Sequence, residues 1–127
     1  METDWVVGQV LAERDAQGLA DDTLVLFTTD NGCSPAAKID DLIAKGHKPN
    51  ADWRGHKADI YEGGHRVPFL VRWPGKVKPG TKNSSTITAA DFYKTAADIL
   101  NSTKKVPDDA AEDSFSFLPD LLQKGKT

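Results

Sequence analysis

The sequence lacks several features that would indicate a function by themselves. Its single cysteine, Cys33, excludes an internal disulfide and a zinc site built from cysteines. The 16 Lys and Arg residues are outnumbered by 19 Asp and Glu, giving a net charge of −3. No basic surface for nucleic acid or for anionic lipid is therefore indicated. The longest apolar run, Leu24 to Phe27, is far shorter than the roughly 20 residues of a membrane-spanning helix.

The N-terminus is equally uninformative about location. Met1 to Trp5 has neither a positively charged start nor an apolar stretch, so we expect no signal peptide in this chain, and the compartment stays unknown. A hydrophobic fraction of 39% with 28% charged residues is typical of a globular protein. A length of 127 residues fits one small domain or a piece of a larger one.

The first quarter of the chain predicts half of an α/β unit. Residues 4–19 have apolar side chains at helical spacing, and Gly18 is suited to end such a helix. Residues 23–28 hold the apolar run Leu24 to Phe27 between two threonines, which is typical of a strand buried on both faces of a largely parallel sheet. Ligands of open α/β sheets gather beyond the carboxyl ends of the strands. Asp30 and Asn31 therefore lie where a site is expected.

The rest of the chain predicts a few short elements around one long loop. Residues 33–66 are rich in Gly and Pro, with one or two helical turns near residues 37–45, and long loops of this kind are usually functional or disordered. Trp53 and Tyr61 within it favour an ordered loop. Further elements are predicted as strands at residues 67–72 and 86–88 and as helices at 89–100 and 114–123.

Two segments carry residues suited to chemistry. Asp30 and Asn31 offer hard oxygen ligands of the kind that calcium prefers, although calcium needs six to eight of them. Taken alone, the pair is better explained as an ordinary turn after a strand. The segment from Arg54 to Pro68 places several cations in a Gly-rich loop, as recognition of sulfate or phosphate requires. The alternative interpretation of this segment is a surface loop with ordinary ion pairs.

Taken together, the two segments resemble type I sulfatases. That family has a strand ending in Thr-(Ser/Thr)-Asp-Asn-Gly, a loop with Arg-Gly-x-Lys and Tyr-Glu-Gly-Gly-x-Arg-Val-Pro, and then an apolar strand followed by Trp-Pro-Gly. The same motifs occur here in the same order, and the resemblance extends over essentially the whole chain, at residues 29–32, 54–57, 61–68, 73–75 and 115–119.

The resemblance implies a role for particular residues. Asp30 and Asn31 would be two ligands of an active-site Ca²⁺, and Lys57 would be the catalytic, sulfate-binding residue that stabilises charge on the departing oxygen. We expect Asp30 and Lys57 to form two walls of one sulfate site. Six further residues would support the loop without taking part in the reaction: Arg54, Tyr61, Glu62, Gly63, Gly64 and Arg66. Glu62 would form an ion pair with either Arg66 or Arg54.

No nucleophile is assigned. Members of the family use a formylglycine made from Cys/Ser-x-Pro-x-Arg, whereas the sequence after Cys33 has Ala37 at the arginine position. We interpret Cys33 as an incidental loop cysteine. The histidines His47, His56 and His65 are interpreted as surface or packing residues, because the family motif gives these positions no catalytic role.

The predicted fold class is therefore α/β. It would be a fragment of the alkaline-phosphatase-like sulfatase fold, with a few-stranded sheet, flanking helices and a long active-site loop. Residues 1–127 would form a partial catalytic domain that lacks the N-terminal half with the nucleophile. Many full-length relatives are expected to be periplasmic or secreted.

Three functions stay open at this point. One is hydrolysis of a sulfate ester. Another is a non-catalytic fragment that at most binds an anion or a partner and self-associates through exposed sheet edges. The third is a phosphoryl or phosphonate hydrolase of the same superfamily, although its zinc sites would need further Asp and His ligands. Neither nucleic acid nor a membrane is expected as a partner.

Overall fold

The structure is a computed structural model that describes residues 2–102, 107 and 109–123. The chain divides into two compact units. One holds residues 24–72, and the other holds the described residues that precede and follow this range. The two segments singled out from the sequence, around Asp30 and around Lys57, fall in the same unit.

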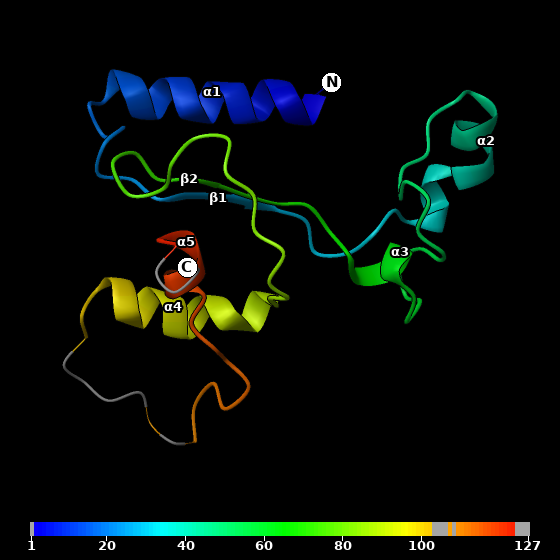
Figure 1. The fold of residues 1–127 in the computed structure, drawn as a ribbon. Helices are drawn as coiled ribbons and strands as arrows, with labels where there is room; N and C mark the ends of the chain where they lie inside the picture. The colour runs from blue at the N-terminus through cyan, green and yellow to red at the C-terminus, as the bar shows by residue number, and fades with distance from the viewer. Residues whose placement is uncertain (1, 103–106, 108, 124–127) are drawn as a thin grey trace. The chain divides into compact units, whose positions relative to one another are not determined.

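The unit of residues 24–72 is built on a two-stranded sheet. Strand β1 (Val25–Thr28) pairs with β2 (Phe69–Arg72), with Thr28 opposite Phe69 and Val25 opposite Arg72 (Figure 1). The pairing is antiparallel, so the prediction of a largely parallel neighbourhood for β1 is wrong for the strands that the structure describes. The reason is that the intervening loop returns the chain in the opposite direction and provides no crossover to a parallel strand.

A third strand was predicted at residues 86–88 and is not formed. The backbone N–H of Thr88 donates to the carboxylate of Asp91 at 2.7 Å instead of to a neighbouring strand. This bond caps the short 3₁₀ helix η2 (Ala89–Asp91). A strong local cap therefore uses the donor that a strand would have needed.

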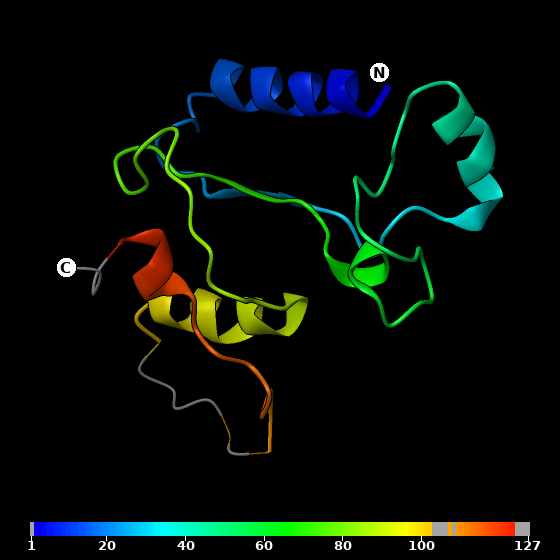
Figure 2. The same ribbon diagram turned by 45° about the vertical axis from the view of Figure 1, so that its right-hand side comes forward.

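The loop between β1 and β2 is ordered by three short helices. It contains η1 (Pro35–Ala37), α2 (Ile39–Ala44) and α3 (Glu62–His65), and it returns through α3 to β2 (Figure 2). The helical turns predicted near residues 37–45 are confirmed. Helix α3 was not predicted, because its Gly63 and Gly64 are poor helix formers, and close backbone packing forms it instead.

In the other unit, α1 (Glu2–Ala16) begins two residues earlier than predicted and ends three residues earlier. Gly18 does end it, with φ of +69°. The N–H of Leu19 bonds the carbonyl of Arg14 at 3.1 Å, and that of Gly18 bonds Asp15 at 3.1 Å. This pair of bonds is a Schellman motif, which satisfies carbonyls that the helix end leaves open.

Most apolar side chains of α1 are exposed despite their helical spacing, and Val7 and Leu11 are half-buried. Trp5 is 64% exposed and Val10 is 61% exposed. Among the described residues, Phe117 is the only apolar side chain that counts as buried. Such exposure agrees with the expectation of self-association, which stays a prediction.

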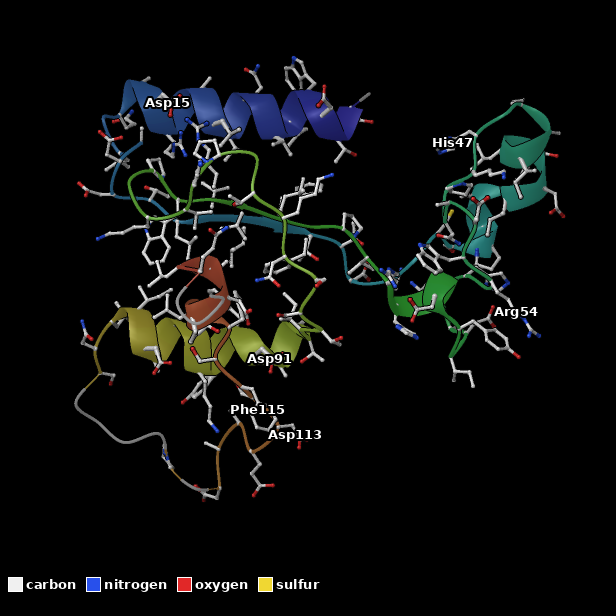
Figure 3. The ribbon with its side chains drawn as sticks, in the orientation of Figure 1. Asp15, His47, Arg54, Asp91, Asp113 and Phe115 are labelled. Carbon is white, nitrogen blue, oxygen red and sulfur yellow. The ribbon has the colours of Figure 1, made fainter. Side chains whose placement is uncertain are left out.

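Helix α4 (Phe92–Ile99) packs against α5 (Leu118–Leu121), which is shorter than the predicted helix at residues 114–123. The buried carboxylate of Asp91 accepts the N–H of Phe115 at 2.7 Å, and both residues are labelled in Figure 3. The buried hydroxyl of Thr95 accepts the N–H of Phe117 at 3.0 Å. Polar side chains of α4 and η2 thus hold the segment that leads into α5.

Asp91 gives this packing a dependence on pH. Hydrogen bonds from the N–H of Phe115, and then from that of Thr88, hold the pKa of Asp91 below its usual range. A carboxyl with a lowered pKa stabilises the fold above its unfolded pKa of about 4, and this stabilisation is lost as pH falls through the folded pKa.

We expect Asp91→Asn to lower the free energy of unfolding at pH 7 by about 1–3 kcal/mol, because charge-assisted bonds to buried backbone groups are weakened. The difference from wild type should shrink below pH 4. Urea unfolding followed by circular dichroism across pH measures both effects. Asp98→Asn, on the exposed side of α4, is the control, and an equal loss in that variant would contradict the prediction.

None of the helices in the described ranges combines the length and apolar character needed to cross a bilayer.

Candidate functional site

The first part of the site is the turn that follows β1. Asp30 is exposed and Asn31 is half-buried. The side-chain amide of Asn31 donates to the carbonyl of Gly32 at 2.9 Å, and the hydroxyl of Thr29 donates to the carbonyl of Asn31 at 3.2 Å. The amide group of Asn31 is thus used locally, which leaves its side-chain oxygen and the Asp30 carboxylate as the ligands that this turn offers.

The second part is the segment around Lys57, and backbone bonds join it to the first. The N–H of Lys57 donates to the carbonyl of Cys33 at 3.0 Å. The N–H of Gly32 donates to the carbonyl of Gly64 at 2.9 Å. The two motifs that the sequence separates by 27 residues, Asp30 to Lys57, are therefore neighbours in one unit.

Glycines make this close approach possible. A Cβ added to Gly32 would lie 1.8 Å from the carbonyl oxygen of Gly63. A Cβ on Gly63 would lie 2.2 Å from the oxygen of Gly55, and one on Gly64 would lie 2.1 Å from that of Asp59. Neither Gly63 nor Gly64 has a positive φ, so what these glycines provide is room for tight backbone packing.

The two arginines of the loop contact aromatic rings. The guanidinium of Arg54 lies 3.8 Å from the ring centre of Tyr61, and that of Arg66 lies 4.2 Å from the ring centre of Trp53. Arg66 also donates to Glu62 at 2.7 Å, so Glu62 pairs with Arg66 and not with Arg54. Both guanidinium groups thus have partners within the loop, a geometry that suits support of the loop.

Lys57 differs from the arginines. Its side chain is exposed, and in the described part of the chain its ammonium group has no hydrogen bond or ion pair. Its backbone, by contrast, is fixed by the bond to Cys33. The backbone of Lys57 is fixed while its ammonium group is unpaired at the end of a long side chain, and such a group is suited to bind an anionic ligand.

Two of the histidines, His56 and His65, and the cysteine make local contacts, whereas His47 is exposed. The ring nitrogens of His56 and His65 lie 2.9 Å from the backbone carbonyls of Lys57 and Ile60, respectively. The hydroxyl of Ser34 accepts the N–H of Ala36 and caps η1. Next to this cap, Cys33 is half-buried with its thiol 3.6 Å from the carbonyl of Ser34.

A shallow depression of about 380 Å³ opens in the same unit. Charged groups of both signs contribute to it, and its lining consists of Pro35, Lys38, Ile39, Asp40, Asp41 and His56. A ligand resting there would meet hydrogen-bond donors and acceptors more than apolar surface.

The oxygen ligands fit calcium in kind but not in number. Asp30 and Asn31 supply two hard oxygens next to each other, whereas calcium takes six to eight. In the described ranges, no three His, Cys, Asp or Glu side chains gather closely enough to hold a metal ion. Within the described ranges, the turn thus offers two adjacent oxygen ligands of the kind that calcium prefers.

Sequence reasoning missed two polar residues that organise the loop. The side chain of Asn50 bonds both Cys33 and Gly55, and the carboxylate of Asp59 accepts the N–H of His56 at 3.0 Å. Both residues looked like ordinary loop residues. No local pattern marks them, because their partners are set by how the loop folds back.

Comparison with known proteins fits this geometry. The family model described as "Sulfatase" matches residues 1–102, which is most of the chain and includes both parts of the site. The chain belongs to the sulfatase family. Two relatives illustrate the likeness. N-acetylgalactosamine-6-O-sulfatase of Bacteroides thetaiotaomicron is 37% identical over all of this chain. Steryl-sulfatase of Rattus norvegicus is 40% identical over 95% of it.

Solved structures agree with the family assignment. A chain from a study of glycosaminoglycan metabolism by Bacteroides thetaiotaomicron superposes with a TM-score of 0.83 at 38% identity, covering 98% of this chain and 26% of that one. The crystal structure of Ps i-CgsB with a neocarrahexaose gives 0.74 at 28% identity, covering 92% and 24%. The predicted fold class, a fragment of the α/β sulfatase fold, is confirmed.

The chain covers only part of the length of its sulfatase relatives. The chain spans 25% of the length of the Bacteroides relative and 20% of the rat relative.

Proposed function

We propose that this chain forms part of the active site of a sulfuric ester hydrolase, in which Lys57 binds the sulfate group. One observation carries the proposal: the N–H of Lys57 is bonded to Cys33, two residues beyond Asn31, while its ammonium group is exposed and unpaired in the described structure. The backbone of this lysine is thus held beside the turn that carries Asp30.

The proposed site also includes a calcium ion bound at the turn of Asp30 and Asn31. Asp30 and the side-chain oxygen of Asn31 would hold the ion together with ligands from outside this chain, and the ion would supply positive charge next to sulfate oxygens. Lys57 would add a second positive charge and stabilise the oxygen that leaves with the alcohol. The arginines would keep the loop closed through Tyr61 and Trp53.

The sulfate group is the part of the substrate that this chain is proposed to bind. The names of the relatives include an amino-sugar sulfatase and a sterol sulfatase, and what these substrates share is the sulfate ester. The runner-up is a non-catalytic fragment that binds an anion or a partner, supported by the absence of a Cys/Ser-x-Pro-x-Arg motif from the sequence. Nothing in the described structure favours a phosphoryl or phosphonate hydrolase, for which zinc ligands would be needed.

Sulfate titration of the ¹⁵N-labelled chain tests the proposal. We expect sulfate, against chloride at equal ionic strength, to shift amide signals of residues 30–33 and 54–57. Lys57→Ala should weaken the response about tenfold, because a charge-assisted bond is lost. The control Lys45→Ala removes the same charge from an exposed lysine of the same unit.

If the response of the amide signals to sulfate weakens equally in the two variants, sulfate binding depends only on the net charge of the chain, and the proposal fails. With calcium and an aryl sulfate, the chain should show no turnover, because a covalent mechanism has no nucleophile here. Turnover that Lys57→Ala abolishes would overturn this view of the chain as incomplete.

A further inference from the structure

The side chain of Asn50 spans the gap between the two parts of the site. Its oxygen accepts the N–H of Cys33 at 2.9 Å, and its amide nitrogen donates to the carbonyl of Gly55 at 3.0 Å. Cys33 lies two residues after Asn31, and Gly55 lies two residues before Lys57. One half-buried side chain thus touches both segments close to their proposed ligand-binding residues.

The chemistry of the asparagine side chain suits this position. Its planar amide accepts on one side and donates on the other, so two bonds fix the separation of two backbone segments. The same Cys33 that donates its N–H to Asn50 offers its carbonyl to the N–H of Lys57. Asn50 therefore holds the residue whose carbonyl accepts the backbone N–H of Lys57.

We propose that Asn50 is a positioning residue of the sulfate site. It holds the Lys57 segment at a fixed distance from the turn of Asp30 and Asn31, and it touches no ligand itself. The inference rests on the proposed function only in that Lys57 is the group that binds sulfate. Asn50 also accepts a turn bond from Trp53 through its backbone carbonyl, a bond that any residue would accept and that substitution of the side chain leaves in place.

The test compares three variants by amide hydrogen exchange without sulfate and by sulfate titration. Asn50→Ala removes both side-chain bonds. Asn50→Asp keeps the acceptor for Cys33 and loses the donor to Gly55. The matched control Asn83→Ala lies in the other unit, where the side chain of Asn83 likewise accepts an N–H, from Ser85 at 2.7 Å, and donates, to Asp120 at 3.0 Å.

We expect Asn50→Ala to speed exchange of the Lys57 amide about tenfold and to weaken the sulfate response by a similar factor, as loss of hydrogen bonds of ordinary strength predicts. Amides paired between β1 and β2 should exchange as in wild type. Asn50→Asp should protect the Cys33 amide as wild type does and still weaken the sulfate response. Asn83→Ala should change neither measurement at Lys57.

Unchanged exchange at Lys57 in Asn50→Ala would overturn the inference. So would an equal acceleration at β1 and β2, because Asn50 would then merely stabilise the whole unit. If Lys57 exchange accelerates as expected but wild type shows no sulfate response at residues 54–57, the link between the segments stands and the proposed function fails. The exchange and titration arms thus separate the two failures.

Discussion

Gly32→Ala is expected to separate the two parts of the site. The new methyl carbon would lie 1.8 Å from the carbonyl oxygen of Gly63 and 2.8 Å from its carbonyl carbon. These are backbone atoms, so no rotation of a side chain relieves the overlap. The Gly63–Gly64 segment must move away, and the bond from the N–H of Gly32 to the carbonyl of Gly64 breaks with it.

The cost should be about 3 kcal/mol, combining overpacking at a tight contact with the loss of a backbone hydrogen bond. Urea unfolding gives the stability, and amide exchange at Lys57 gives the state of the site. Because the contact is made only in the unit of residues 24–72, the loss should be confined to amides of that unit.

Gly8→Ala is the matched control. It makes the same chemical change within α1, where an added Cβ would meet nothing within 4 Å. Alanine is the better helix former, so this variant should be more stable than wild type by about 0.5–1 kcal/mol. Wild-type exchange at Lys57 in Gly32→Ala would contradict the close approach of the two segments.

Lys57→Ala is expected to cause the largest loss of activity when the chain is placed in a complete enzyme. A chimera would carry this chain in place of the matched quarter of the Bacteroides relative, to which it is 37% identical. A TM-score of 0.83 with a solved chain of 38% identity indicates that the backbone is compatible with such a graft. If Lys57 stabilises charge on the leaving oxygen, its removal should lower kcat/KM for a sulfate ester about 10²–10³-fold.

Lys45→Ala in the same chimera should keep kcat/KM within about twofold, because an exposed charge away from the site contributes little. Removal of calcium by a chelator should lower the activity of the parent chimera and leave its fold unchanged by circular dichroism. A chimera that hydrolyses sulfate esters equally well with and without Lys57 would exclude the proposed role.

Local sequence patterns predicted most elements and erred where tertiary bonds decided the outcome. The helix that ends at Gly18 and the strands β1 and β2 follow from apolar spacing and glycine chemistry. The predicted strand at residues 86–88 failed, because the carboxylate of Asp91 takes the N–H of Thr88. Apolar spacing reports which residues could form a strand, but not which donors are already used.

For the site, the sequence determined which residues are available. The motifs around Asp30 and Lys57 indicated the family, and the family assignment is confirmed. The roles of Asp30, Asn31 and Lys57, and the calcium ion, stay predictions. Composition also settled that one cysteine can form no internal disulfide.

Only the tertiary structure decided how these residues meet. In the structure, Glu62 pairs with Arg66 and not with Arg54. Gly32, Gly63 and Gly64 are the positions at which backbone segments lie in close contact. It also revealed Asn50 as the side chain that spans the two segments. The physical reason is that a contact between distant segments depends on how the loop folds back, whereas motifs and periodicity describe only neighbours along the chain.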